Sequence, residues 1–221
     1  MTAAFVAACA LLGLLIGGCV PAVARWAAVP DDVSARAAVT VPLTGMVFGL
    51  LAWRVGPAPG LPAYLYLAAV GVALIAIDVA VHRLPDRLTF PSYPIVAVLL
   101  VGASAVDGEW AALGRAAAGA AVLYGVYYLL AVAAPGGMGF GDVKLAGVLG
   151  AVLAWAGWAP LLLGAFLGFL YGGLVSLALL LARRATRRTR VPFGPFMVAG
   201  ALTALVLGEA AAAGYITFAI A

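Results

Sequence analysis

Residues 61–82 read LPAYLYLAAVGVALIAIDVAVH, in which seventeen uncharged residues, Leu61 to Ile77, precede the acid Asp78. A helix rises about 1.5 Å per residue and the hydrocarbon core of a bilayer is about 30 Å thick, so a crossing needs roughly 20 apolar residues. This stretch has that length. It predicts a membrane-spanning helix that carries a carboxylate about one turn before its end.

The composition extends this prediction to the whole chain. Of its 221 residues, 67% are hydrophobic and 9% are charged, and the mean hydropathy is +1.19. A soluble domain typically has about 25% charged residues. The sequence therefore excludes a soluble globular domain and predicts an all-α, polytopic membrane protein, with residues 1–221 as a single integral-membrane domain.

Apolar runs between charges and Pro or Gly breaks predict about eight transmembrane helices. The residues from 143 to 182 are too many for one crossing, so we expect a break at 157–160, with one Pro-kinked segment as the alternative. No basic residue precedes Arg25, so we expect the first apolar segment to be a retained span and not a signal peptide. The expected spans are 3–24, 38–54, 62–82, 92–106, 110–133, 143–158, 160–182 and 193–217.

The basic residues predict the orientation of these spans. With the N-terminus outside, ten of the twelve Lys and Arg residues fall in cytoplasmic loops, and only Arg54 and Arg115 fall outside. Cytoplasmic loops carry such an excess of basic residues, so we expect an N-out, C-out topology. Asp78 and Asp142 then lie on the cytoplasmic side, because the fourth and fifth spans return the chain to that face.

Asp142 lies near the end of the glycine-rich run GMGFGDVK, residues 137–144. A carboxylate at the centre of a membrane helix costs about 2.5 to 3.5 kcal/mol on insertion scales, so such residues usually have a function. Asp78 is the candidate partner. Two carboxylates in a poorly solvated site share a proton. The ionised one can deprotonate a water, and the protonated one can donate to an oxyanion or leaving amine, as in an aspartic protease.

The glycines before Asp142 support a catalytic interpretation. Glycine adopts positive φ angles and lets another backbone approach closely, so an extended substrate could lie against this loop as an added strand. The glycines concerned are Gly136, Gly137, Gly139 and Gly141.

The residues alone leave other interpretations open. Asp142 could merely N-cap the sixth span while Asp78 pairs with Lys144 or Arg83. Lys144 either stabilises the ionised form of Asp142 or extends to the membrane surface. The same acids could also serve a proton-coupled transporter, although the chain shows no internal repeat, or a non-catalytic scaffold.

Four separated segments, which occur in the order expected for the family, resemble those of the type IV prepilin peptidases. These are membrane aspartyl proteases of the Gly-x-Gly-Asp class. The loop GFGDVKL resembles the family's signature, and RLPDRLT resembles the stretch that follows its first aspartate. The segments are 13–17 with Arg25, 77–78 with 83–89, 139–145, and 191–196.

The resemblance implies a peptidase that cleaves the leader of prepilin-like proteins, of the Tad/Flp type or pseudopilins, on the cytoplasmic side of the bacterial inner membrane. Asp78 and Asp142 would be catalytic, and Gly139, Gly141 and Lys144 would support the loop that binds substrate. The substrate's apolar segment would bind laterally between spans. Implied partners are membrane lipid and pilus or secretion assembly machinery, with no nucleic acid, metal or nucleotide cofactor.

One departure from the family pattern narrows this expectation. Bifunctional members carry a cytoplasmic insert with a four-cysteine zinc site after the first span, and they also methylate the new pilin terminus. Here only Trp26 to Ala37 occupy that place, and both cysteines of the chain, Cys9 and Cys19, lie before it. The resemblance thus implies a peptidase and gives no support for a methyltransferase.

The remaining charged and aromatic residues have structural interpretations. Asp86 follows Pro85 and is expected in a solvated turn. His82 is expected at the membrane interface. The basic run 183–190 is expected to anchor a span at anionic headgroups. Three tryptophans are expected in an outer aromatic belt, namely Trp110, Trp155 and Trp158.

Overall fold

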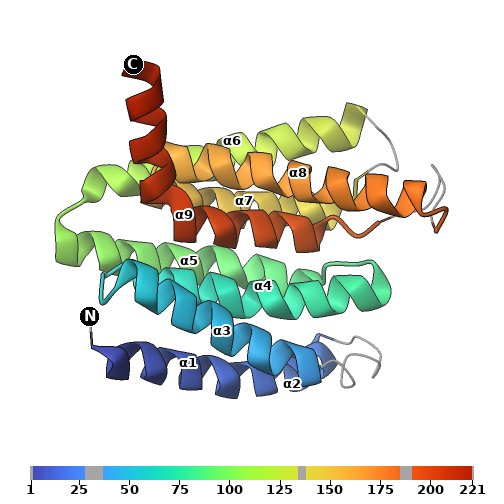
Figure 1. Ribbon diagram of the computed structural model, residues 1–221, viewed down its shortest axis with the longest axis horizontal. Helices are drawn as coiled ribbons and strands as arrows, with labels where there is room; N and C mark the ends of the chain where they lie inside the picture. The colour runs from blue at the N-terminus through green and yellow to red at the C-terminus, as the bar shows by residue number, and fades with distance from the viewer. Residues whose placement is uncertain (1, 28–36, 134–137, 185–190, 221) are drawn as a thin grey trace.

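The computed structural model describes residues 2–27, 37–133, 138–184 and 191–220, the side chains of 208–220 excepted. The described residues form helices and no strands, arranged as a bundle (Figure 1). The helices are α1 (Ala3–Gly18), α2 (Val20–Trp26), α3 (Ala37–Val55), α4 (Leu61–Val81), α5 (Asp86–Asp107), α6 (Trp110–Ala133), α7 (Phe140–Ala156), α8 (Trp158–Leu181) and α9 (Gly194–Ile220).

The all-α fold predicted from the apolar runs is confirmed, since each of the eight predicted spans corresponds to helix in the structure. The first span is bent by 40° where α1 meets α2. Within the described ranges, five helices are long and apolar enough to cross a membrane, or six if α1 and α2 form one span. Because α7 and the part of α9 up to Leu207 are shorter, eight crossings and their orientation stay predictions.

The sequence predicted one helix boundary correctly and another incorrectly. The break between the sixth and seventh spans is confirmed at Gly157, whose φ of 152° separates α7 from α8. The fourth span was predicted to start at residue 92, but α5 starts at Asp86 and contains Pro91 and Pro94. The error arose from reading these prolines as breaks. The hydroxyl of Ser92, like that of Thr89, instead donates to a carbonyl four residues earlier within this first part of the helix.

The centre of the bundle is α7, which packs against α4, α5, α6, α8 and α9. Small residues permit this close packing, because Gly150 of α7 lies directly against Gly119 of α6 and leaves no room for a side chain at either position. Tyr93 of α5 reaches α7 in the same way, since its hydroxyl occupies the space beside Gly147 and donates to the carbonyl of Lys144 at 2.7 Å. The tight packing fixes the position of the first turn of α7.

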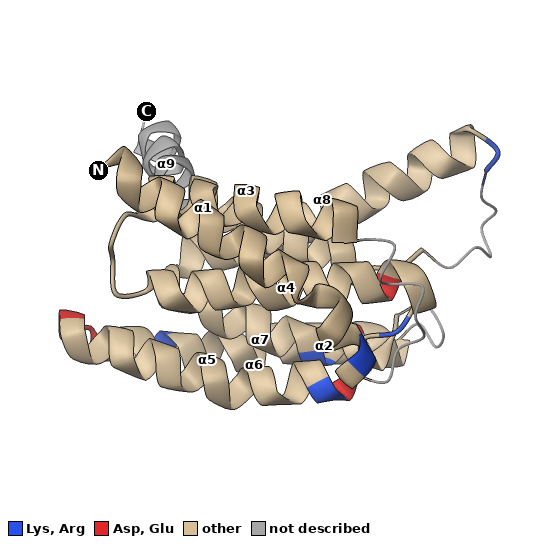
Figure 2. Cartoon of the chain, turned by 90° about the horizontal axis from the view of Figure 1, so that it is seen from below, with Lys and Arg blue, Asp and Glu red and all other residues tan. Residues whose placement is uncertain are grey.

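The described charged residues gather at the ends of the bundle and leave its middle nearly uncharged (Figure 2). Most of them lie at the end formed by the α4–α5 turn and the start of α7. There Arg87 donates to the backbone carbonyl of Trp26 at 3.0 Å and so joins α5 to the end of α2. The two ends of α7 therefore lie in different surroundings, and Asp78 and Asp142 belong to the more charged end.

Candidate active site

Asp78 lies in the last turn of α4 and is only 4% exposed. The helix ends at His82, which adopts the left-handed conformation with a φ of 52° and donates its N–H to the carbonyl of Asp78 at 2.8 Å. The chain thus turns back immediately after the aspartate. In the described part of the chain, Asp78 Oδ2 has no hydrogen-bond partner, so this oxygen is available to another group.

Asp142 is the third residue of α7 and is 8% exposed. Its Oδ2 accepts the backbone N–H of Gly139 at 3.3 Å, which is one half of a capping box. The alternative in which Asp142 is the N-cap is therefore wrong, because Gly139 is the N-cap and Asp142 accepts its N–H from the third helical position. Because α4 packs against α7, the two carboxylates come within electrostatic reach of each other. The structure thus brings Asp78 and Asp142 into one buried site.

The start of α9 completes the surroundings of Asp78. A Cβ built on Gly194 would lie 2.8 Å from Asp78 Oδ2, and the backbone N–H of Gly194 faces the carboxylate. The N-terminus of a helix carries free N–H groups and a partial positive charge, which favour an ionised carboxylate nearby. The sequence points to the segment 191–196 through the family resemblance but predicts no role for Gly194.

The turn between α4 and α5 packs against both segments that surround the aspartates. A Cβ on Gly141 would lie 2.8 Å from Leu84 Cβ, and one on Gly194 would lie 3.3 Å from Leu84 Cδ2. Leu84 therefore contacts the glycine next to each carboxylate. The expectation of positive φ angles in the glycine loop is wrong for Gly139, whose φ is −76°, and for Gly141, which already belongs to α7. Both glycines instead allow a neighbouring group to approach the backbone closely. Gly136 and Gly137 lie outside the described residues.

Lys144 pairs with Asp86 and not with either buried aspartate. Its Nζ lies 2.7 Å from Asp86 Oδ1, and it also sits 4.7 Å and 5.3 Å from the ring centres of Phe90 and Phe140. The alternative in which Asp78 pairs with Lys144 is therefore wrong, and the expectation for Asp86 is correct in its exposure to solvent but wrong in placing it in a turn. Asp86 opens α5, and its side chain, although 58% exposed, joins α5 to the first turn of α7.

An aromatic cluster encloses the site from the side of α6 and α8. Tyr127 is almost fully buried and packs 5.4 Å from the ring of Phe169 and 6.1 Å from that of Phe193. Tyr127 is also within electrostatic reach of Asp142. The sequence does not indicate this residue, because a tyrosine in an apolar helix carries no signal of its neighbours.

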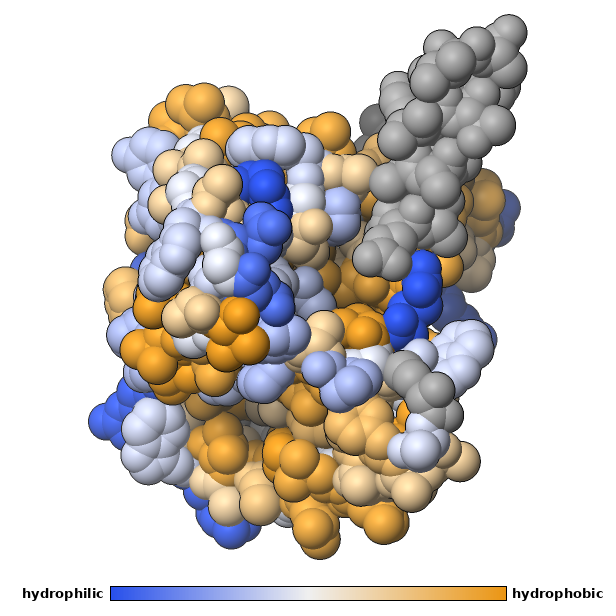
Figure 3. Space-filling model, turned by 90° about the vertical axis from the view of Figure 1, so that its left-hand side faces the viewer, coloured by the Kyte–Doolittle hydropathy of each residue, from blue (hydrophilic) through white to orange (hydrophobic). Residues whose placement is uncertain are grey.

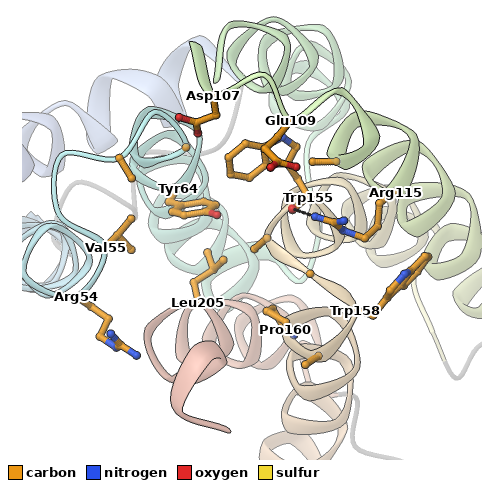
Figure 4. A pocket seen from close by; sticks show the side chains of 16 residues that line it. Arg54, Val55, Tyr64, Asp107, Glu109, Arg115, Trp155, Trp158, Pro160 and Leu205 are labelled. Carbon is orange, nitrogen blue, oxygen red and sulfur yellow. Dashed lines mark hydrogen bonds between the residues drawn. The ribbon is translucent and has the colours of Figure 1, made fainter. Parts of the chain in front are cut away.

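A separate cavity of about 520 Å³ lies at the opposite end of α7, roughly 20 Å from Asp142 by helix length (Figure 4). Figure 3 faces this end of the bundle, where hydrophilic side chains lie among hydrophobic ones. Arg54 and Arg115, the two basic residues predicted outside, both line the cavity with Asp107 and Glu109. Trp155 was predicted to lie in an outer aromatic belt. This prediction was incomplete, because its indole N–H donates to Ser104 Oγ at 2.9 Å instead of facing only lipid.

The arginines of this cavity bind backbone carbonyls. Arg115 donates to the carbonyls of Ala154 and Trp155 at 2.6 Å and 2.7 Å, which caps the end of α7. Arg54 donates to the carbonyl of Val206 in α9 at 2.9 Å. No three His, Cys, Asp or Glu side chains lie close enough to hold a metal ion among the residues that the structure describes. Of the basic run 183–190, residues 185–190 lie outside those residues.

Known proteins resemble this chain over most of its length. The profile of the type IV leader peptidase family matches residues 65–177, which include Asp78, Asp86, Asp142 and Lys144. No solved structure shows a significant match.

Relatives named prepilin leader peptidase/N-methyltransferase occur in several bacteria. The relative of Stutzerimonas stutzeri is 33% identical over 79% of this chain and 60% of its own length. The relative of Aeromonas hydrophila is 33% identical over 84% of this chain and 63% of its own length. The relative of Bacillus subtilis is 30% identical over 84% of the chain and 73% of its own length. The chain thus spans less than two thirds of the first two relatives. The matched profile and these identities show that this multi-pass membrane protein belongs to the type IV leader peptidase family.

Proposed function

We propose that the protein is a membrane aspartyl endopeptidase that cleaves the leader peptide of prepilin-like proteins, using Asp78 and Asp142. One observation carries this proposal: two buried carboxylates lie within electrostatic reach of each other in a bundle whose interior is otherwise nearly uncharged. Family membership and the names of the relatives support leader peptides as substrates. Burying two acids side by side is unfavourable unless it serves a function.

The chemistry requires one of the two acids to be ionised and the other protonated. The ionised carboxylate accepts a proton from a water, whose oxygen attacks the carbonyl carbon of the scissile peptide bond. The protonated carboxylic acid donates to the carbonyl oxygen as the tetrahedral intermediate forms. When the C–N bond breaks, the leaving amine takes the proton that the first carboxylate accepted from water, a hydroxyl of the tetrahedral intermediate returns a proton to the second carboxylate, and the new carboxyl group is released. Close like-charged acids share one proton readily, so the pair can occupy this state before substrate binds.

Each acid faces the start of a helix, which favours its ionised form. The start of α9 faces Asp78, and Asp78 Oδ2 has no hydrogen-bond partner in the described chain. Asp142 lies in the first turn of α7 and accepts the backbone N–H of Gly139 through Oδ2. We therefore propose that either acid can act as the base while the other carries the shared proton.

The proposal also includes the place of action and the class of substrate. Most described basic residues lie at the end of the bundle that holds the aspartates, which supports our proposal that this end faces the cytoplasm at a bacterial inner membrane. Substrates would be prepilins, including those of the Tad/Flp type, or pseudopilins. Pilus or secretion assembly machinery would receive the cleaved product.

Cleavage of a co-expressed prepilin tests the proposal. We expect the wild type to shorten the prepilin on a gel, and we expect Asp78→Asn and Asp142→Asn each to abolish this shift. Asparagine has nearly the shape of aspartate, so the fold should survive. It neither accepts a proton from water nor donates one as an acid, so cleavage should be lost. The abundance of each variant in the membrane must be measured in the same samples.

Different outcomes separate the competing interpretations. Cleavage by either asparagine variant would refute the two-aspartate mechanism. If the wild type leaves every prepilin tested intact while it takes up protons in vesicles in an Asp78-dependent way, the transporter interpretation replaces the peptidase. Matched control variants are Asp107→Asn and Glu109→Gln, because these acids lie at the other end of the bundle.

A further inference from the structure

The two candidate catalytic aspartates are closed off from solvent. Asp78 is 4% exposed and Asp142 is 8% exposed, and Asp78 Oδ2 is buried without a hydrogen-bond partner in the described chain. In a productive complex the reacting atoms lie within about 3.5 Å of each other, so a peptide bond must come into contact with the pair. Some part of the surrounding structure must therefore move before a substrate reaches these acids.

The turn between α4 and α5 places one side chain against the surroundings of both acids (Figure 1). A Cβ on Gly141, the residue before Asp142, would lie 2.8 Å from Leu84 Cβ. A Cβ on Gly194 would lie 2.8 Å from Asp78 Oδ2, and 3.3 Å and 3.4 Å from the two methyl carbons of Leu84. Leu84 thus packs against the glycine beside each acid, where a substrate backbone would have to lie.

This turn is held less firmly than the other two segments around the site. In the part of the chain that the structure describes, the backbone groups of Arg83 and Leu84 make no hydrogen bonds. By contrast, the Tyr93 hydroxyl donates to the carbonyl of Lys144 in α7, and two amides at the start of α9 donate to the carbonyl of Phe193. Segments with few hydrogen bonds open locally at the lowest cost in free energy. The turn is therefore the segment that moves most easily.

The ends of the turn indicate where it bends. His82, which ends α4, has a φ of 52°, a conformation that is unfavourable for residues other than glycine, so a rotation there relieves an unfavourable backbone. The other end is fixed, because the carbonyl of Pro85 accepts the N–H groups of Leu88 and Thr89 in the first turn of α5. A hinge at His82 would thus carry Leu84 away from the glycines and leave both helices in place.

We propose that residues 82–85 form a lid on the aspartate site, with Leu84 as the side chain that closes it, an inference that rests on the proposed peptidase function. In the closed state described here, Leu84 keeps peptide from the acids. Substrate enters when the turn swings outward about His82, and its backbone takes the place that Leu84 leaves beside Gly141 and Gly194. The turn lies at the more charged end of the bundle, so the lid admits the polar leader from the aqueous side (Figure 2).

Chemical labelling of carboxyl groups measures the lid without any need for catalysis. A water-soluble carbodiimide and an amine convert accessible carboxyl groups to amides, which mass spectrometry of peptides locates. We expect Asp78 and Asp142 to be labelled slowly in the wild type and at least five-fold faster in Leu84→Ala, because alanine lacks the methyl groups that hold the lid closed. Asp107 and Glu109, which are exposed at the opposite end, should be labelled at equal rates in both proteins.

Three further variants separate opening of the lid from general loosening of the fold. Leu88→Ala truncates another half-buried leucine, which packs in α5 against a cluster that includes Ile77, and should be labelled like the wild type. Leu84→Met keeps nearly the same apolar volume and should also match the wild type. Leu84→Val, a smaller truncation, should give an intermediate rate. Unchanged labelling in Leu84→Ala and Leu84→Val, or equally fast labelling in Leu88→Ala, would overturn the lid.

Cleavage of a soluble leader peptide by the same variants tests the consequence for catalysis. Apparent affinity is reduced in proportion to the fraction of enzyme that is open, so opening the lid should lower the KM. We expect Leu84→Ala to lower the KM about three- to ten-fold with kcat changed less than two-fold, and we expect Leu84→Met and Leu88→Ala to match the wild type.

The outcomes distinguish failure of the lid from failure of the peptidase. An unchanged or raised KM in Leu84→Ala would refute the lid while leaving the peptidase function intact. Failure of the wild type to cleave any leader peptide or prepilin would instead refute the peptidase function. The labelling rates would still decide whether the turn closes over the pair, because they do not depend on cleavage.

Discussion

The charged side chains at the two ends of α7 differ in whether their hydrogen-bonding groups have partners. At the far end, Arg115 donates to two carbonyls of the last turn of the helix, so its charge is used to stabilise the backbone. At the near end, Asp142 is buried beside Asp78, and one oxygen of Asp78 has no hydrogen-bond partner in the described chain. A satisfied charge indicates a structural role, and a buried oxygen left without a partner indicates a functional one.

This contrast suggests how the fold supports the site. Capping by Arg115 and the packing of small residues along α6 fix the length and register of α7 from its far end. The near end can then hold two acids that repel each other, because the rest of the helix supplies the stability. The comparison predicts that changes near the aspartates alter cleavage without reducing stability, and that changes at the far end do the reverse.

Among substitutions that leave both aspartates in place, Gly194→Ala should give the largest effect on cleavage. The new Cβ would lie 2.8 Å from Asp78 Oδ2, so the carboxylate would have to move from its present position. We expect cleavage to fall by about 10- to 100-fold, which is the loss of roughly 1.4 to 2.7 kcal/mol in transition-state stabilisation. Rates of prepilin cleavage and the melting temperature in the same detergent measure this.

Gly173→Ala is the matched control for that substitution, because a Cβ at Gly173 meets no atom within 4 Å. Alanine is favoured over glycine in a helix by about 1 kcal/mol, so neither variant should lose much stability. Full cleavage activity in Gly194→Ala would show that Asp78 does not act from its present position.

Arg115→Gln should produce the opposite result. It removes charge-assisted hydrogen bonds to the carbonyls of Ala154 and Trp155, each worth about 1.5 to 3 kcal/mol. We expect a lower melting temperature and lower abundance in the membrane, while cleavage per folded molecule changes less than three-fold. A large loss of cleavage per molecule at unchanged stability would break the contrast between the two ends of α7.

The ion pair of Asp86 and Lys144 should give a smaller effect. It joins the starts of α5 and α7 at 2.7 Å, but the Asp86 side chain is 58% exposed, and partly exposed pairs contribute little. We expect Asp86→Asn and Lys144→Gln each to slow cleavage by about 3- to 10-fold. If the pair positions the aspartates, the double variant should be no slower than the slower single variant.

Additive losses in that cycle would show that the two residues act separately. High salt gives an independent check, because it screens exposed charges. We expect salt to slow the wild type more than it slows the double variant, which lacks the pair.

The sequence predicted the elements better than the contacts between them. Asp78 and Asp142 stood out because each interrupts an apolar run, and hydropathy located the helices that carry them. The start of α5 was misplaced because local proline statistics do not show which carbonyls the neighbouring hydroxyls satisfy. The partner of Lys144 lies 58 residues away in sequence, so no local pattern contained that pair.

Glycine roles were predicted in part. The sequence predicts positive φ angles and close approach for the glycines before Asp142, and Gly141 does allow close approach of Leu84 but without a positive φ angle. Gly194, which makes room for the Asp78 carboxylate, carried no such prediction. Which glycines do this depends on how α4, α7 and α9 meet, and a single sequence does not specify that packing.

Glu109→Gln should have the smallest effect of all and tests whether the far end is merely structural. Glu109 is exposed and lines the far cavity, yet no ion pair joins it to Arg115 in the described chain. Surface substitutions of this kind usually change stability by less than about 0.5 kcal/mol. We therefore expect cleavage within two-fold of the wild type and an unchanged melting temperature. A marked fall in cleavage would mean that charge in the far cavity influences the aspartates through α7, and that the two ends of this helix do not act independently.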